Sequence, residues 1–256
     1  MPDLDPFIRF WRALDDAFAL VEQVWWGGVV TDPRFPVIWD VNYARVEADE
    51  PNLTVAEVER TLLPAIRASG ARVRHLVLLR PERATGLLSE LGTRGDQLSW
   101  DTVMEHRARR APRARNAGVE EILVPDRDFW ARLRESLSEF RVTEPEAQEQ
   151  LLRLEREVLF PFGKRWFGVR EAERLVALGS LVQCEGVGYV DHVVTFPEAR
   201  GRGYASSIVG RIVREAREAG AERVCLLAET GTGPVALYER LGFHEVGKLA
   251  SSITPA

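Results

Sequence analysis

The stretch that most constrains the fold of this chain is His192–Ala216, with the sequence HVVTFPEARGRGYASSIVGRIVREA. An apolar strand pattern ends at Pro197, the tetrapeptide Arg-Gly-Arg-Gly follows, and an amphipathic helical pattern begins directly afterwards. Glycines allow left-handed backbone conformations and the close approach of a ligand. The first turn of a helix offers free N–H groups and a partial positive charge. The stretch therefore predicts either an ordinary strand-to-helix turn or a cradle for an anionic group such as a phosphate.

Two common nucleotide-binding motifs do not account for this stretch. The Gly-Lys-Ser/Thr ending of a P-loop is absent. A Rossmann fingerprint needs one more glycine at the proper spacing and a parallel sheet, whereas the residues before His192 predict an antiparallel hairpin. The sequence therefore favours neither a P-loop nucleotide hydrolase nor a dinucleotide-binding domain.

The size and charge of the chain limit the classes of protein that it can represent. Its 256 residues suffice for one large domain or two small ones, each with a core. No apolar run approaches the roughly 20 residues that span a membrane, and the N-terminus lacks the basic and apolar segments of a signal peptide. The net charge of −5 argues against general nucleic-acid binding. We therefore expect a cytoplasmic protein with neither a membrane nor a nucleic-acid partner.

Cys184 and Cys225 are the two cysteines of the chain, and both lie in apolar, strand-like runs. Buried free thiols are more typical of that setting than a disulfide or a metal site. We accordingly expect no metal cofactor.

The first half of the chain alternates between helical and strand-like patterns. Apolar residues at helical spacing predict a first helix over residues 5–26. Thr54, with Glu57 three residues later, predicts the start of a second helix, which ends at Gly70. Gly92 is expected to close a third, shorter helix. Strands are expected over Val37–Glu47, residues 72–79 and residues 96–106.

An arginine-rich segment, Arg107–Gly118, separates the two halves. It carries five arginines, one proline and few apolar residues, as linkers between domains often do. We place the domain boundary inside it, which gives an N-terminal domain over residues 1–112 and a C-terminal domain over residues 113–256. A phosphate- or RNA-binding arm is the alternative interpretation of these arginines.

The second half contains a longer series of elements. A strand is expected from Val119, followed by helices over residues 126–140 and 144–159. Alternating polar and apolar residues between two turn signals then predict three antiparallel strands. A helix, a strand, a helix that Gly242 closes and a last strand complete the pattern, with the first helix over residues 205–219 and the strand over residues 223–229.

Both halves share one order of strand, helix, strand, short helix and strand. The segment LLSELG (Leu87–Gly92) holds the place in the first half that LYERLG (Leu237–Gly242) holds in the second. Two interpretations stay open, a degenerate internal repeat and a chance likeness between two α/β domains.

Two motifs in the second half resemble those of one enzyme family. Arg200–Ala205 (RGRGYA) matches the pattern Arg/Gln-x-x-Gly-x-Gly/Ala at each specified position, and Ala236–Phe243 (ALYERLGF) resembles a helix signature of the same family. Over roughly residues 119–256 the chain resembles the GNAT superfamily of acetyl-CoA-dependent N-acyltransferases. The resemblance implies an α+β fold, in which a mixed sheet is splayed open in its middle and flanked by helices. Here a smaller α/β domain precedes it.

The resemblance also implies that acetyl-CoA is the acyl donor. Its pantetheine arm would lie in the opening of the sheet, hydrogen-bonded to the backbone of Val193, Val194 and Thr195 as an added strand would be. Its pyrophosphate would lie against backbone N–H groups at the start of the helix, where two arginines add positive charge. The residues of this cradle are Arg200, Gly201, Arg202, Gly203, Tyr204 and Ala205.

Acyl transfer to an amine requires a proton donor for the departing thiolate and a base for the amine. The resemblance implies that Tyr238 is the donor, and the alternative is a half-buried tyrosine that packs its helix on the sheet. For the base, Asp191 is the first candidate, His192 the second and Glu229 the third. Each of these three is equally well explained as a polar residue at the end of a strand.

The chain departs from the family pattern at two places. Thr230–Pro234 (TGTGP) stands where many members carry an asparagine, so any asparagine contact with the donor is in doubt. The first half lacks both motifs, and Leu88 occupies the place comparable to Tyr238. We therefore expect the N-terminal half to cover the acceptor side of the cleft or to support the catalytic half.

These observations favour an enzyme that acetylates a primary amine carried by a small molecule or by a protein. The alternative is a catalytically inactive acyl-CoA-binding sensor or interaction module, because the base is not assigned convincingly. Spacing does not identify the acceptor. A homodimer is compatible with the sequence, which leaves the oligomeric state open.

Overall fold

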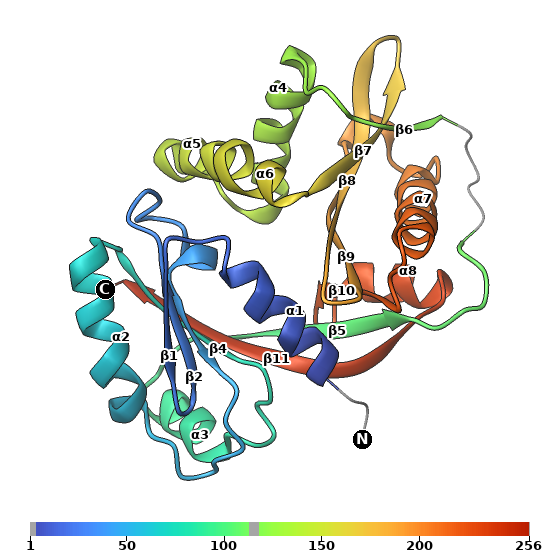
Figure 1. Cartoon of the computed structure of the whole chain (residues 1–256). Helices are drawn as coiled ribbons and strands as arrows, with labels where there is room; N and C mark the ends of the chain where they lie inside the picture. The colour runs from blue at the N-terminus through green and yellow to red at the C-terminus, as the bar shows by residue number, and fades with distance from the viewer. Residues whose placement is uncertain (1–3, 113–117, 256) are drawn as a thin grey trace. The chain divides into compact units, whose positions relative to one another are not determined.

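The structure, a computed structural model, describes residues 4–112 and 118–255. It divides into two compact units that are not contiguous in the sequence (Figure 1). The first unit comprises Met1–Val103, Ala228–Thr232 and Glu245–Ala256. The second unit comprises Met104–Leu227 and Gly233–His244. Each unit contains paired strands and helices, and each is described by itself.

The sheet of the first unit contains one parallel strand pair among antiparallel ones. β1 pairs with β2, β2 with β3, and β4 with β11 in antiparallel fashion, whereas β3 and β4 run parallel. Their bounds are β1 Leu20–Val24, β2 Gly27–Thr31, β3 Tyr43–Val46, β4 Val73–Leu78 and β11 Phe243–Pro255. β5, Leu98–His106, runs across the boundary of the unit.

Helices α2 (Val55–Ser69) and α3 (Thr85–Thr93) bury their apolar faces against this sheet. α1 (Asp5–Asp15) lies on the side of the strands away from α2, and a 3-10 turn spans Trp39–Val41 (Figure 1). The predicted start and end of α2 are confirmed. Thr54 and Glu57 form a reciprocal capping box, and Gly70 adopts φ 73° after the last turn.

Three predictions for the first half are wrong in part. The helix expected over residues 5–26 ends at Asp15, because Leu20–Val24 pairs with Gly27–Thr31 as a hairpin. Gly27 allows that hairpin to pack closely, since a Cβ there would lie 1.9 Å from the carbonyl oxygen of Arg45. Of the strand expected over residues 37–47 only β3 forms. α3 passes through Gly92 and ends at Thr93.

The sheet of the second unit is an antiparallel meander with one parallel strand at its side. β6 pairs with β7, β7 with β8, and β8 with β9 in antiparallel fashion, and β10 runs parallel to β9. This confirms the three predicted antiparallel strands. The bounds are β6 Val119–Glu121, β7 Arg165–Glu171, β8 Arg174–Cys184, β9 Val187–Thr195 and β10 Arg223–Glu229.

Helices cover both faces of this sheet (Figure 1). α7 (Tyr204–Glu218) packs on one face, where a Cβ on Gly179 would lie 2.7 Å from Ile208. α4 (Arg127–Ser136) packs on the other, where Phe129 and Leu178 share a core. The remaining helical segments are α5 Pro145–Leu154, α6 Phe160–Phe162, α8 Gly233–Arg240, the 3-10 turns η2 Leu137–Phe140 and η4 Pro197–Ala199, and the π-helical turn η3 Glu155–Leu159.

The predicted opening in the sheet lies between β9 and β10. The two strands pair at three positions, the last of them Cys225 with Tyr189. β9 continues to Thr195 and β10 to Glu229 without further pairing to each other. This confirms the expected class of a splayed mixed sheet flanked by helices, and it leaves the second half of β9 with an open backbone edge.

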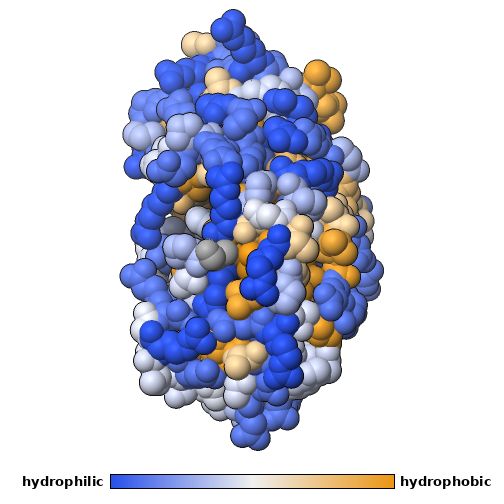
Figure 2. Space-filling view, turned by 90° about the vertical axis from the view of Figure 1, so that its left-hand side faces the viewer, coloured by the Kyte–Doolittle hydropathy of each residue, from blue (hydrophilic) through white to orange (hydrophobic). Residues whose placement is uncertain are grey.

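The predicted domain boundary between residues 112 and 113 stays a prediction, because residues 113–117 of the arginine-rich segment lie outside the described residues. Within residues 4–112 and 118–255, no helix is both long and apolar enough to cross a membrane. Both cysteines are free thiols, and Cys225 is fully buried while Cys184 is partly exposed. Hydrophilic side chains cover most of the face shown in Figure 2, with hydrophobic patches among them.

Candidate functional site

The open edge of β9 presents backbone groups of alternate residues. The N–H of Phe196 donates to Val176 of β8 at 3.1 Å. Because backbone groups alternate in direction along a strand, the N–H and C=O of Val194 also face β8, and those of Val193 and Thr195 face the opening. The C=O of Thr195 accepts a hydrogen bond from Nε of Arg200 at 3.1 Å. Two of the three residues predicted for the pantetheine edge thus present their backbone to it.

A β-bulge interrupts β9 just before this edge. Ser180 pairs with Asp191 and Leu178 with Val194, so Gly179 alone faces the two residues between them. One of the two, His192, has φ 51°, in the left-handed region that favours glycine. The ring Nε2 of His192 lies 2.7 Å from Oγ of Ser136. Burial lowers the pKa of His192 to about 3, so the imidazole is neutral at pH 7.

The glycine-rich turn after η4 leads into an uncapped helix. Gly201 has φ 78° and Gly203 has φ 82°, which explains glycine at both positions. Gly203 precedes α7 directly, and among the described residues no side chain caps the start of this helix. The first helical bond runs from the N–H of Ser207 to the C=O of Gly203. The N–H groups of the preceding residues, Tyr204 and Ala205 among them, therefore have no partner within the helix, which is the arrangement that binds anions at the starts of other helices.

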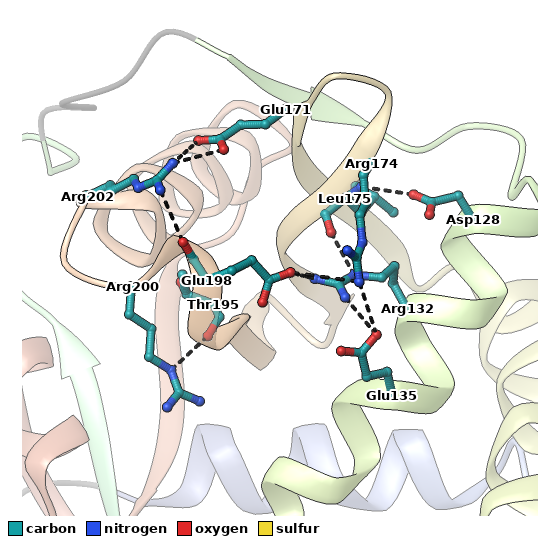
Figure 3. Close-up of polar contacts among 10 residues, drawn as sticks. All are labelled: Asp128, Arg132, Glu135, Glu171, Arg174, Leu175, Thr195, Glu198, Arg200 and Arg202. Atoms are coloured by element: carbon teal, nitrogen blue, oxygen red, sulfur yellow. Dashed lines mark hydrogen bonds and ion pairs between the residues drawn. The ribbon is translucent and has the colours of Figure 1, made fainter.

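Both arginines of the cradle are engaged with carboxylates, and Figure 3 shows the pair of Arg202 with Glu171. Arg202 donates to both oxygens of Glu171 at 2.8 and 2.9 Å and to the C=O of Glu198 at 3.1 Å. Arg200 donates to Glu139 at 2.6 Å. Tyr204 also donates to Glu171, and these bonds hold the pKa of Glu171 below its usual value. Because the two positive charges are already paired, backbone N–H groups carry most of the capacity to bind an anion.

Arg132 of α4 fixes the loop that begins the cradle. Its side chain is 2% exposed and donates to Glu198 of η4 at 2.7 Å and to the C=O of Leu175 at 2.7 Å (Figure 3). Its guanidinium also lies 3.3 Å above the ring of Phe196. Sequence reasoning missed this residue, since nothing distinguishes it from the other arginines until α4 and η4 are placed together.

Tyr238 of α8 is buried and packs against Phe243, with ring centroids 5.9 Å apart. Burial, together with the negative charge of Asp191, raises the pKa of Tyr238 to about 12. The phenol is therefore protonated at neutral pH and can act as a proton donor. Both predicted catalytic residues, Tyr238 and Asp191, lie in the second unit.

Asp191 belongs to a network of charges around Lys164. The ammonium of Lys164 lies 2.9 Å from Asp191 and 3.1 Å from Glu155, and Nε1 of Trp166 donates to Glu155 at 2.5 Å. Lys164 is 5% exposed and Asp191 36% exposed. Burial opposes ionisation of Asp191, but the Lys164 ammonium outweighs it and holds the Asp191 pKa below its usual value. Asp191 is thus a partly accessible, ionised carboxylate.

Sequence reasoning missed both Lys164 and Glu155. One signal was present, because Lys164 is one of only two lysines in a chain with 34 basic residues. A lysine retained beside a strand in such an arginine-rich chain indicates a position where a compact ammonium is needed.

Glu229, the third candidate base, lies at the end of β10 in the segment that belongs to the first unit. Burial, together with the charge of Glu229, raises the pKa of Asp101 in that unit. Tyr238, Asp191 and His192 all lie in the second unit. The structure therefore groups the first two candidate bases with the predicted proton donor and assigns the third to the other unit.

A cavity of about 490 Å³ lies in the first unit, between α1 and the β1–β2 hairpin. Four of its charged residues form two pairs, Arg12 with Glu47 and Arg80 with Asp5. Trp25 is exposed at its edge. The cavity is therefore explained by a self-paired polar cluster, and we assign no ligand to it.

A family model matches the part of the chain that contains β9, the glycine-rich turn before α7 and Tyr238. The model for the Acetyltransferase (GNAT) family aligns with residues 130–243, from within α4 to the start of β11. Over 63 residues the chain is 43% identical to N-alpha-acetyltransferase MAK3 of Arabidopsis thaliana. This match covers 24% of the chain and 33% of that protein, so the chain spans one third of the length of this relative.

Two solved structures are similar over nearly the whole chain. A GCN5-related N-acetyltransferase from Kribbella flavida is 18% identical with a TM-score of 0.63, covering 97% of this chain and 95% of that one. A functionally unknown conserved protein from Staphylococcus epidermidis ATCC 12228 is 13% identical with a TM-score of 0.72, covering 89% and 90%. At these identities the likeness is one of fold, and it includes both compact units.

Proposed function

We propose that the protein transfers an acetyl group from acetyl-CoA to a primary amine, on the premise that residues 130–243 match the model of the Acetyltransferase (GNAT) family. The observation that carries the proposal is the separation of β9 from β10 after Tyr189. It leaves an open strand edge in the same unit as the uncapped start of α7. An extended amide-containing arm ending in a pyrophosphate has the chemistry that suits these two features.

The donor is held by backbone groups for the most part. The C=O of Val193 and the backbone of Thr195 pair with the amides of the pantetheine arm, for which Arg200 must release the C=O of Thr195. The N–H groups at the start of α7 bind the pyrophosphate. Arg200 and Arg202 contribute charge to the extent that the phosphates replace Glu139 and Glu171 as their partners.

Transfer of the acetyl group develops negative charge first on the carbonyl oxygen and then on the departing sulfur. The N–H of Val193, directly after the bulge and facing the opening, is placed to donate to the carbonyl oxygen. Tyr238, protonated at neutral pH, donates its proton to the thiolate. In this scheme the backbone stabilises the oxyanion and one side chain supplies the proton.

The acceptor amine has to reach the thioester as a neutral nucleophile. Asp191 stays ionised at all but acidic pH and is partly exposed, so it attracts the ammonium form and receives a proton through water. His192 is the second candidate base and Glu229 the third. Asp191→Asn is expected to raise the KM for the amine and to flatten the pH dependence of kcat/KM.

One observation favours the alternative of an inactive acyl-CoA sensor. The pKa values of Asp191 and His192 both lie below neutrality, and a general base is most effective when its pKa lies near the working pH. An enzyme that uses Asp191 therefore depends on placing the amine beside it. A sensor would need only the donor site.

The first unit has features that favour a single donor site in the chain. Its parallel strands β3 and β4 pair along the length of β3, so the opening found between β9 and β10 has no counterpart there. The start of α2 is occupied by the chain's own carboxylates, Glu57 on the N–H of Thr54 and Glu90 on the N–H of Val55. We propose that this unit supports the second one and binds no acetyl-CoA.

The order of elements supports the hypothesis of an internal repeat. Each unit has an antiparallel strand pair, a helix, a strand parallel to the preceding one and a second helix. The hypothesis stays a prediction. On it, the first unit descends from a copy that has lost its donor site.

The test combines calorimetry with turnover. We expect acetyl-CoA to bind the purified chain, and a panel of small amines and peptides to show release of free thiol above the rate of hydrolysis. Binding without turnover on any amine would support the sensor instead. Absence of acetyl-CoA binding would contradict both proposals.

A further inference from the structure

We infer that His192 is a positioning residue that holds the bulge of β9, so that the N–H of Val193 faces the opening between the strands. The inference rests on the proposed function, in which that N–H donates to the carbonyl oxygen of the thioester. It removes His192 from the list of candidate bases and gives Ser136 a part in the reaction.

The backbone at His192 is unfavourable for any residue with a Cβ. Its φ of 51° lies in the left-handed region, where a side chain crowds the following carbonyl oxygen. Strain of this kind persists only where surrounding contacts enforce it, and it collects at functional positions. His192 is the first of the two residues that lie opposite Gly179 in the bulge, and its left-handed turn sets the directions of the N–H groups that follow it.

The contacts that enforce this conformation come from the imidazole ring. Its centroid lies 4.6 Å from that of Phe140 and 5.2 Å from that of Trp166. Ser136, at the last turn of α4, is fully buried and lies 2.7 Å from Nε2. Trp166 is in turn fixed by its bond to Glu155. The ring is therefore held from α4, from η2 and from β7 at once.

The hydrogen bonds define which nitrogen of the ring carries the proton. The hydroxyl of Ser136 donates its one hydrogen to the C=O of Leu133 at 2.7 Å. Its oxygen can then only accept from the ring, so Nε2 of His192 is the protonated nitrogen. Burial lowers the pKa of the ring to about 3. A neutral imidazole with that pKa is a poor proton acceptor, and its fixed contacts suit it to hold the backbone of β9 in position.

Ser136→Ala tests the hydrogen bond that holds the ring of His192, and Ser138→Ala is its matched control. Ser138 makes the same kind of bond, from its hydroxyl to the C=O of Glu135 at 2.7 Å, but it is exposed. We expect Ser136→Ala to lower kcat about tenfold, as the loss of one buried hydrogen bond to the ring, with the shape of the pH profile unchanged. Ser138→Ala should leave kcat unchanged. Equal kcat values for the two variants would overturn the inference.

His192→Asn and His192→Val separate a positioning role from a basic one. Asparagine tolerates the left-handed region and valine does not. If His192 is a positioning residue, the asparagine variant keeps more activity than the valine variant. The pH–kcat profile of the asparagine variant then keeps the shape of the wild-type profile. Loss of the acidic limb of the profile in His192→Asn would show a base. If the valine variant does not fold, nitrogen NMR of the wild-type ring decides. A neutral ring with Nε2 protonated between pH 5 and 8 supports the inference, and titration in that range contradicts it.

Binding measurements keep this inference distinct from the proposed function. Acetyl-CoA carries a thioester carbonyl oxygen that free CoA lacks, so Ser136→Ala should weaken binding of acetyl-CoA severalfold while that of free CoA is unchanged. This readout remains valid if the wild-type chain turns over no amine, a result that would contradict the proposed function alone. An equal loss of affinity for acetyl-CoA and CoA, or no loss for either, would contradict the inference.

Discussion

Tyr238, the predicted proton donor, is buried in the second unit, and its pKa is raised. A buried tyrosine in this state can donate a proton and does not ionise below about pH 10. Its role as donor remains a prediction that substitution can test.

Tyr238→Phe should lower kcat about 10- to 100-fold, within the usual range for loss of a general acid, because the thiolate then leaves without a proton. The affinity for acetyl-CoA should stay within about twofold, since backbone groups hold the donor. Thiol release and calorimetry measure the two quantities. Tyr43→Phe is the control, because it removes a buried hydroxyl from the first unit. Unchanged turnover in Tyr238→Phe would contradict the assignment.

The ion pair of Asp191 with Lys164 predicts a pH-dependent stability. The pKa of Asp191 is lowered from 3.8 and that of Lys164 is raised from 10.5. The carboxylate therefore contributes stability above about pH 4, which is lost as the pH falls through its folded-state pKa. The ammonium contributes below about pH 10, which is lost as the pH rises through its own higher folded-state pKa.

Asp191→Asn should therefore lower the free energy of unfolding by roughly 1–3 kcal/mol at pH 7, discounted for the partial exposure of Asp191. The difference from wild type should shrink below about pH 4. Urea unfolding at several pH values measures it. Glu157→Gln, which breaks the exposed pair with Arg153, should cost at most about 0.5 kcal/mol. A difference that is constant from pH 3 to pH 7 would contradict the argument.

Residues such as Lys164, Glu155 and Arg132 could not be predicted from local sequence. The partner of Lys164 in β9 lies 27 residues away, and that of Arg132 in η4 lies 66 residues away. Such pairs depend on the packing of helices against the sheet, which no motif encodes. Tyr238 was found because its role is tied to a motif contained in one helix.

At the scale of elements, the start of α7 is the feature on which donor binding depends. It follows two left-handed glycines and is uncapped among the described residues. Gly220, at the other end of the same helix, is also left-handed, with φ 87° and open space where a Cβ would lie. The two ends therefore allow a matched pair of substitutions.

Gly203→Trp should abolish detectable acetyl-CoA binding, because an indole would occupy the approach to the N–H groups. Gly220→Trp should bind normally. Both should lose a similar stability, about 1–2 kcal/mol, from a side chain in a left-handed conformation. Calorimetry and thermal unfolding provide the two readouts. Normal acetyl-CoA binding by a folded Gly203→Trp variant would show that the glycine-rich turn does not bind the donor.

Element boundaries were predictable where a local signal defines them. The capping box at Thr54 and the left-handed Gly70 define both ends of α2. The segment after Asp15 was assigned wrongly because its apolar spacing suits a helix, whereas pairing with Gly27–Thr31 makes Leu20–Val24 a strand. Cross-strand pairing is a tertiary effect that overrides helical periodicity.

At the scale of the whole molecule, the number of donor sites is the testable quantity. The closed β3–β4 pair and the self-capped start of α2 predict that one chain binds one acetyl-CoA. Calorimetry should give a stoichiometry close to one per chain. Gly203→Trp should remove all of the binding heat. A residual site in that variant, or a stoichiometry near two, would contradict the proposed role of the first unit.

Which segments of the chain make up each unit could not be predicted from the sequence. A linker can be recognised from composition, but the pairing of Ala250 with Leu78 in β11 and β4 joins residues that are far apart in the chain. No spacing rule predicts such a pair. The splayed sheet of the second unit was predictable because the family resemblance implied it.

The membership of β11 in the first unit has a consequence for how the gene can be divided. The chain passes between the units four times, at residues 103, 227, 232 and 244. A fragment ending at residue 112 would lack β11, the strand that pairs with β4. The unpaired backbone groups of β4 would then promote aggregation. We therefore do not expect the fragment ending at residue 112 to be an autonomous module that recombination could transplant. Cells making the halves from separate plasmids should yield soluble material only when both are expressed together.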